Sequence, residues 1–174
     1  MWYHHQLEKT LHLVILREPY LSRILSGQKR IESRFARDRR PPFARVNAGD
    51  ILLLKRAGGS LVGLALVKHV ISRALMPDVL DEIRHNYAAD LAIDDPHFWQ
   101  MQLHKRYVTL IWIDEVYPLS PIPLSHRDRR GRVVIERYNG CSFVAGDVQR
   151  FQFLRCVGEA MKTLAKLYLV PTMD

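Results

Sequence analysis

The stretch GQKRIESR, from Gly27 to Arg34, is the part of the sequence that says most about the fold. It follows an apolar helical pattern, and a glycine in this place commonly ends a helix because it tolerates a left-handed backbone. Apolar and charged residues then alternate over residues 31–35, which is the period of a half-buried strand. The stretch therefore predicts a helix, a turn carrying Lys29, and a strand with Glu32 and Arg34 on one face.

On either side of this stretch the chain predicts a series of strands and helices. Apolar runs predict strands at residues 11–16, 31–35, 51–54, 61–70 and 107–117, with an edge strand at 133–135. Helical spacing predicts helices at residues 18–26, 77–91 and 95–104, and a long amphipathic helix from Asp147 onward. Residues 57–60 predict a tight hairpin, Gly63 a bulge or a close backbone approach, and Pro118 the end of its strand. Strands joined by short turns favour an α+β fold with a mostly antiparallel sheet.

Length and composition predict one cytoplasmic domain. We expect residues 1–146 to form that domain and residues 147–174 to form a helix packed on it. Two cysteines, Cys141 and Cys156, are too few for a disulfide framework, and no cysteine–histidine spacing indicates a metal. No apolar run is long enough for a membrane span, and no glycine-rich phosphate loop or other cofactor motif occurs.

The charge indicates the class of partner. The formal net charge is +8 and the pI is about 9.8. Residues 17–45 hold nine basic residues against three acidic ones, and a second arginine cluster lies at residues 127–137. Arginine suits bidentate phosphate recognition, so clustered arginines favour a polyanion such as nucleic acid. The alternative is a solvated basic face that only keeps the protein soluble.

Two short patterns in the first part of the sequence resemble a known family. The pattern Gly-x-Lys-x-x-Glu-x-Arg at residues 27–34, followed by Gly49-Asp50 before a strand hairpin, resembles the ASCH domain of the PUA-like superfamily. The resemblance implies a β-pseudobarrel flanked by helices, with an RNA or nucleotide ligand in a cleft beside the Gly-x-Lys turn. Some ASCH members look like hydrolases: a ribonuclease branch, and an amidohydrolase branch that acts on an acetylated cytidine with a lysine, a threonine and a glutamate. Lys29 falls on that lysine, but Glu32 occupies the position of the threonine.

The residues themselves also describe a charged recognition site. An arginine can hold a phosphate, a carboxylate can accept from an exocyclic amine, and a lysine can act as a point charge. The candidate ligand-binding residues are Lys29, Glu32, Arg34, Arg30, Lys55, Arg37, Arg39, Arg40 and Arg130. The alternative is a buried ion pair that closes the end of the barrel, and Lys55 alone reads more readily as part of a solvated rim.

Three functions are compatible with these patterns. The first is binding of RNA, single-stranded nucleic acid or a nucleotide-like molecule at the Gly27–Arg34 site. The second is a metal-independent hydrolase that uses Lys29 and Glu32 as catalytic residues. The third is a protein-interaction adaptor that docks through the apolar stripe of the C-terminal helix.

Overall fold

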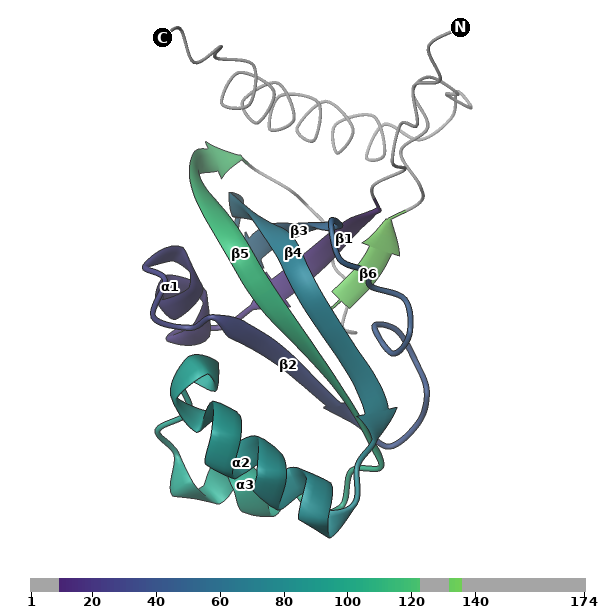
Figure 1. Ribbon diagram of the computed structural model, residues 1–174. Coiled ribbons are helices and arrows are strands. Elements are labelled where there is room, and N and C mark those ends of the chain that lie inside the picture. The colour runs from purple at the N-terminus through teal and green to yellow at the C-terminus, as the bar shows by residue number, and fades with distance from the viewer. Residues whose placement is uncertain (1–9, 123–131, 136–174) are drawn as a thin grey trace, which may run out of the picture.

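The computed structural model describes residues 10–122 and 132–135 (Figure 1). The elements along the chain are β1 (Leu11–Leu16), α1 (Tyr20–Leu25), β2 (Ile31–Ala36), β3 (Ile51–Arg56), β4 (Leu61–Ala74), α2 (Pro77–Leu91), α3 (Pro96–Gln102), β5 (Tyr107–Ile122) and β6 (Arg132–Ile135). This order confirms the predicted series of strands and helices as far as the edge strand.

The six strands form one mixed sheet in the order β2-β5-β4-β3-β1-β6. Only β1 and β3 run parallel, since the chain passes through α1, β2 and a long loop between them; the other pairs are antiparallel. The predicted α+β class with a mostly antiparallel sheet is therefore confirmed.

The hairpin between β3 and β4 shows both predicted glycine effects. Gly58 has a φ of 71°, a left-handed conformation that glycine adopts without steric cost. At Gly63 the pairing of β4 with β5 shifts register, and a Cβ atom there would lie 2.8 Å from Leu25 Cδ2 and 3.3 Å from the carbonyl oxygen of Tyr117. Glycine at position 63 therefore lets α1 pack directly against the sheet.

The predicted end of β5 at Pro118 is wrong, because the strand continues to Ile122. Beyond Trp112, β5 has left its neighbour β2 and pairs with β4 alone. A proline is tolerated on such an edge because its missing N–H can face away from the partner strand. Pro118 therefore lies in the part of β5 that has one neighbour, and it does not end the strand.

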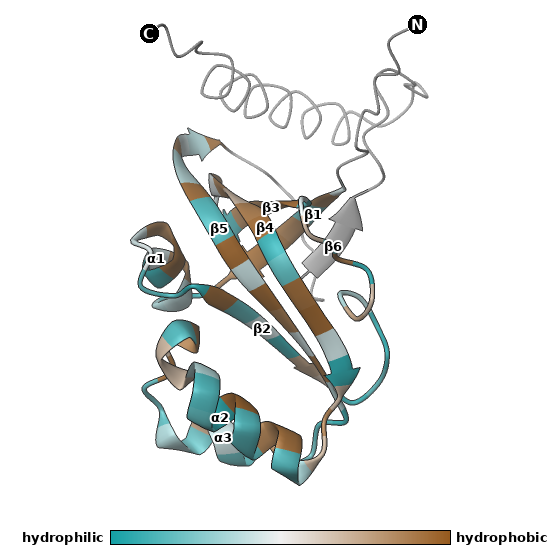
Figure 2. Cartoon of the chain, in the orientation of Figure 1, coloured by the Kyte–Doolittle hydropathy of each residue, from teal (hydrophilic) through white to brown (hydrophobic). Residues whose placement is uncertain are grey.

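Hydrophobic residues fill both faces of the sheet (Figure 2). On the face that we call the inner face, α1 packs Leu21 and Ile24 against strand residues that include Leu52 and Ile111. On the opposite, outer face, α2 and α3 cover β2 and β5. Residues of this outer cluster are Ile31, Leu75, Leu80, Ile83, Leu91, Trp99, Val108 and Leu110.

Some predictions lie outside the described residues. These are the long C-terminal helix from Asp147, and Arg130 in the second arginine cluster. Across the portions of chain that the structure describes, no helix is both long and apolar enough to cross a membrane.

Candidate functional site

The turn after α1 directs Lys29 into the protein. Gly27 adopts a φ of 77°, and the backbone N–H of Lys29 donates to the carbonyl oxygen of Arg23 at 2.8 Å. The side chain of Lys29 is 3% exposed, and its Nζ donates to the carbonyl oxygen of Leu91 at 2.8 Å. Lys29, which the sequence predicted in a turn, therefore extends its side chain to the end of α2.

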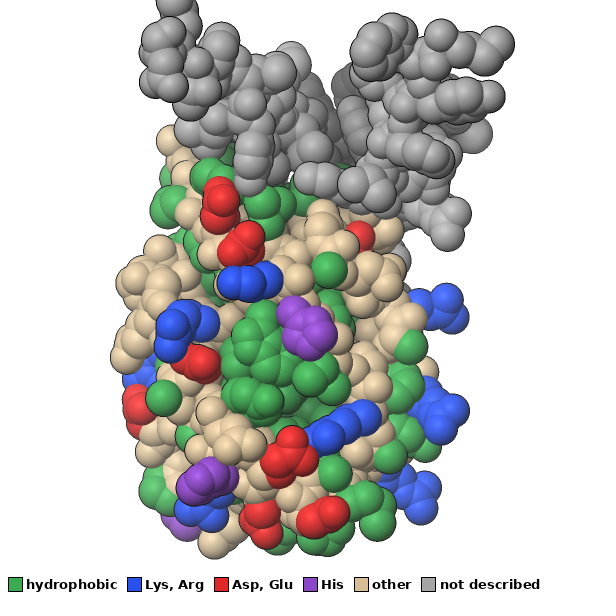
Figure 3. Space-filling view, in the orientation of Figure 1, with side chains coloured by type: hydrophobic (Ala, Val, Ile, Leu, Met, Phe, Trp, Pro, Cys, Tyr) green, Lys and Arg blue, Asp and Glu red, His purple; other side chains and the backbone are tan. Residues whose placement is uncertain are grey.

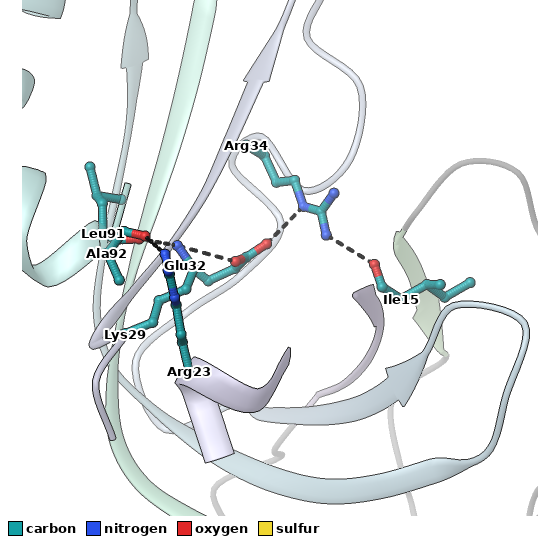
Figure 4. A network of polar contacts seen from close by, with 7 residues as sticks. All are labelled: Ile15, Arg23, Lys29, Glu32, Arg34, Leu91 and Ala92. Carbon is teal, nitrogen blue, oxygen red and sulfur yellow. Dashed lines mark hydrogen bonds and ion pairs between the residues drawn. The ribbon is translucent and has the colours of Figure 1, made fainter. Parts of the chain in front are cut away.

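Glu32 and Arg34 continue this group of charges along β2 (Figure 4). The Oε2 atom of Glu32 lies 3.8 Å from Lys29 Nζ, and its Oε1 atom lies 3.1 Å from Arg34 Nε. Glu32 is 4% exposed, whereas the side chain of Arg34 is 30% exposed. The buried carboxylate thus lies between two cations, and Arg34 is the member of the three that solvent reaches best.

The C-terminus of α2 attracts two of the basic side chains. Helix α2 ends at Leu91 and is followed by the capping residue Ala92, which is left-handed with φ 51°. The carbonyl oxygen of Ala92 accepts from Arg23 NH1 at 2.6 Å. Together with the bond from Lys29 to Leu91, this places two cations at the negative end of the helix dipole, where they are stabilising. Arg23 also pairs with Asp94 just beyond the helix. Lys29 therefore has a structural role at this helix end.

Burial lowers the pKa of Lys29. Its cause is the loss of hydration around the ammonium group, which the nearby charges of Arg34 and Arg23 reinforce, while Glu32 opposes it. The pKa direction shows that burial outweighs the single carboxylate at this position.

Arg34 bridges β2 and β1, two strands that are not neighbours in the sheet. It lies on β2, at one edge, and its NH2 atom is 3.5 Å from the carbonyl oxygen of Ile15 on β1. β1 is four strands away from β2 in the hydrogen-bonded order, so this long contact spans the gap between β2 and β1, which we call the seam.

Gly49-Asp50, the second half of the sequence pattern, forms a buried polar centre. Asp50 Oδ1 accepts from the backbone N–H of Thr10 at 3.0 Å, and Asp50 Oδ2 accepts from that of Asn47 at 2.8 Å. Oδ2 also lies 2.9 Å from Nε2 of His12, which is fully buried. These bonds fix the start of β3 beside β1, so Asp50 has a structural role.

Comparisons with known proteins identify the fold. The model of the ASCH domain family matches residues 14–99. The chain is an ASCH domain protein. In fold it is similar to an ASCH protein from Zymomonas mobilis, with 12% identity, 85% of this chain and 94% of that chain covered, and a TM-score of 0.61. A tyrosine-to-phenylalanine variant of that protein matches at 13% identity, 85% and 96% coverage and a TM-score of 0.60. At these identities the likeness shows the fold alone, and no curated protein matches the sequence significantly.

Arg30 and Lys55 of the ASCH domain have partners other than the Lys29–Glu32–Arg34 group. Arg30 is exposed and pairs with Asp90 on α2, with its Nε 2.9 Å from Oδ1. Lys55 is 3% exposed rather than on the solvated rim that its position predicted, and its Nζ donates to the carbonyl oxygen of Arg56 at 3.2 Å. Lys55 lies opposite Ile15 in the β1–β3 ladder and directly follows Leu54, whose side chain is on the inner face. Successive side chains of a strand point to opposite faces. The side chain of Lys55 is therefore on the other face of the sheet.

The arginines of the loop after β2 differ in their surroundings although all are exposed. Arg40 forms a bidentate pair with Asp38, and the hydrogen bond from Arg40 lowers the pKa of that carboxyl. Arg39 lies over the rings of Phe43 and Tyr107. Arg37 is exposed at the start of the loop. The sequence predicted one basic cluster, but in the structure Arg40 pairs with a carboxylate whereas Arg39 contacts aromatic rings.

The face of the ASCH domain in Figure 3 has mixed charge. Hydrophobic side chains gather at its centre beside a histidine, with basic and acidic side chains around them. The exposed pairs Lys68–Asp114 and Arg73–Glu82, with N–O distances of 4.0 Å and 2.7 Å, place both signs together in space. The positive net charge of the chain is thus not uniformly spread.

Sequence reasoning missed His12 and the acceptors at the end of α2. A lone histidine in an apolar strand carries no signal of its own, and backbone carbonyl groups carry none at all. No group of three or more His, Cys, Asp or Glu side chains that could hold a metal ion occurs among residues 10–122 and 132–135.

Proposed function

We propose that the protein binds RNA on the inner face of its sheet, with Arg34 as the contacting cation and Lys29 and Glu32 as the residues that position it. The observation that carries the proposal is the gradient of exposure across the three side chains. Lys29 and Glu32 are almost fully buried, while the Arg34 side chain is 30% exposed. A guanidinium held by a buried carboxylate has a fixed orientation, which favours recognition of a phosphate or of a base edge.

The ASCH family membership supports RNA as the polyanion, since the fold is generally an RNA-binding one of the PUA-like type. In our proposal the sheet acts as a pseudobarrel whose seam between β1 and β2, spanned by Arg34, opens into the binding cleft. The net charge of +8 favours association with a polyanion over long distances.

A modified-nucleoside hydrolase that uses Lys29 and Glu32 is the second candidate. The lowered pKa of Lys29 favours it, because an amine acts as a base only when its pKa falls. Two features oppose it: Lys29 Nζ is engaged by the carbonyl oxygen of Leu91, and both side chains are buried. RNA binding through Arg34 requires neither residue to leave its partners.

A salt titration with two matched variants tests the proposal. Arg34→Gln and Arg30→Gln remove the same formal charge, but only Arg34 lies in the proposed site. Binding of a labelled single-stranded RNA is followed by fluorescence anisotropy at several salt concentrations. We expect Arg34→Gln to lower affinity about tenfold and to reduce the salt slope by about 1, with Arg30→Gln close to wild type. Equal effects of the two variants, or no binding by the wild type at low salt, would refute the proposal.

A turnover assay with two other variants tests the hydrolase. Wild-type protein, Lys29→Met and Glu32→Gln are incubated with RNA and with an N4-acetylated cytidine, and products are separated by chromatography. Turnover that disappears in both variants while they stay folded would establish the hydrolase. Turnover that persists in both would come from another site or from a contaminant.

A further inference from the structure

We infer that Arg39, stacked on the rings of Phe43 and Tyr107, forms a second subsite that takes an unpaired nucleobase of single-stranded RNA. This inference rests on the proposed function and deepens it, because it adds a preference for single-stranded over duplex RNA. The three residues together are called the stacking subsite below.

The contacts of the stacking subsite hold the guanidinium against an aromatic surface. The guanidinium carbon of Arg39 lies 5.3 Å from the ring centroid of Tyr107 and 5.8 Å from that of Phe43. The two rings lie 5.2 Å apart in an edge-to-face arrangement with an interplanar angle of 69°. Arg39 is exposed, whereas both rings are half-buried. A guanidinium held on one side by rings can stack a base on the other side while its N–H groups reach a phosphate.

The stacking subsite lies on the same sheet face as Glu32 and Arg34. In the ladder between β2 and β5, Arg34 is opposite Thr109 and Ala36 is opposite Tyr107. Directly opposed residues project from the same face, and residues two apart along a strand share that face. The subsite is thus about 7 Å along the strand from Arg34, at a rise of about 3.3 Å per residue. Neighbouring nucleotides of one strand can occupy both places.

Hydroxyl groups lie in the same cross-strand row as Arg34, on the neighbouring strands β5 and β4. Ser72 Oγ and Thr109 Oγ1 are 3.1 Å apart, and Thr109 is buried beside the row that Arg34 occupies. Ser72 Oγ also accepts from the backbone N–H of Ala44 at 3.2 Å, which ties the loop to β4. The loop is fixed further by buried Pro42 and Val46. The stacking subsite is therefore held in place before any ligand arrives, which reduces the entropy lost on binding.

Arg40 is the internal control for this inference. Asp38 accepts from both Nε and NH2 of Arg40, so a carboxylate already occupies the fork that would hold a phosphate. Within the described part of the chain, Arg39 forms no ion pair and contacts rings instead. Two neighbouring, exposed arginines thus differ mainly in what their guanidinium groups face.

The test compares Arg39→Gln with Arg40→Gln in the full chain. Each variant is titrated against a labelled single-stranded ten-nucleotide uridine oligomer and against a ten-base-pair RNA duplex. We expect Arg39→Gln to weaken single-strand binding about tenfold and Arg40→Gln less than twofold, since stacking on one base accounts for a change of this size. Duplex binding should change equally in the two variants, because paired bases are not available to stack.

Two further variants separate stacking from charge. Arg39→Lys keeps the charge but lacks the plane, and should bind the single strand almost as weakly as Arg39→Gln. Phe43→Leu removes one ring. In the double variant with Arg39→Gln, the loss of single-strand affinity should be no larger than in Arg39→Gln alone. Full rescue by lysine, or equal single-strand losses in Arg39→Gln and Arg40→Gln, would overturn the inference.

If the wild type binds RNA and only Arg34→Gln weakens it, this inference fails while the proposed function stands. If the wild type binds no RNA, both fail.

Discussion

The Nζ atom of Lys29 lies 2.8 Å from the carbonyl oxygen of Leu91, so the lysine of the family pattern caps a helix 62 residues further along the chain. The same atom is 3.8 Å from Glu32, which in turn contacts Arg34. One buried side chain thereby joins the end of α2 to the edge strand of the sheet. Changes at Lys29 should consequently affect stability as well as binding.

Lys29→Met should lower the free energy of unfolding by about 2 kcal/mol. The variant removes a charge-assisted hydrogen bond to Leu91 and leaves Glu32 with one cation fewer. Urea unfolding followed by circular dichroism measures the change. Lys68→Met is the matched control, since Lys68 is exposed and 4.0 Å from Asp114, and it should cost less than about 0.5 kcal/mol. Equal effects of the two variants would show that Lys29 has no capping role.

Glu32→Gln should destabilise the protein by about 3 kcal/mol, more than Lys29→Met. The substitution leaves Lys29 and Arg34 near each other without the carboxylate that separates them, and an uncompensated buried charge is costly. In the double variant Lys29→Met with Glu32→Gln, the loss should fall short of the sum by about 1 kcal/mol or more. Additive losses would mean that the two side chains do not interact.

The stability of the wild type relative to Lys29→Met should rise with pH in the alkaline range. The folded-state pKa of Lys29 lies below its usual 10.5, so between these two values the unfolded chain binds more protons than the folded one. The free energy of unfolding of the wild type then increases as pH rises through that window. At pH values below the window, Lys29 is charged in both states and the full cost of burying its ammonium group is present. Urea unfolding of both proteins between pH 7 and pH 10.5 gives the difference. A difference that is flat, or that falls with pH, would contradict the lowered pKa.

Gly27→Ala and Ala92→Gly should change stability in opposite directions. Both positions are left-handed, with φ values of 77° and 51°. No atom lies within 4 Å of a Cβ built on Gly27, so the cost of about 1 kcal/mol comes from the backbone alone. Ala92→Gly relieves the same strain and should stabilise by up to about 1 kcal/mol. Thermal unfolding measures both. A destabilised Ala92→Gly would show that the buried methyl group outweighs the strain.

The sequence predicted the local structure around the site well, because helix, turn and strand there obey short-range rules. Gly27 ends the helix region, and Glu32 and Arg34 share one face of β2 as their spacing predicted. The prediction that β5 ends at Pro118 was wrong. A proline indicates that one hydrogen bond of a ladder is missing, but it does not indicate on which side of the strand, so the strand can continue through it.

Long-range partners could not be predicted from the sequence. The acceptor of Lys29 is a carbonyl group, which every residue carries, and Asp90, the partner of Arg30, lies 60 residues away on α2. The division of Arg39 from Arg40 depends on Tyr107, which reaches the loop only through the pairing of β2 with β5. The first two contacts are decided by the packing of α2 against β2, and the third by the order of strands in the sheet.

Mapping of bound RNA by NMR tests the central claim most directly. Amide signals of the ¹⁵N-labelled protein are followed as a short single-stranded RNA is added at low salt. We expect the largest shifts at residues 27–34, at residues 39–44 and at Thr109, with little change on the outer surface of α2. Shifts confined to α2 and α3, or no shifts at all, would contradict RNA binding on the inner face of the sheet.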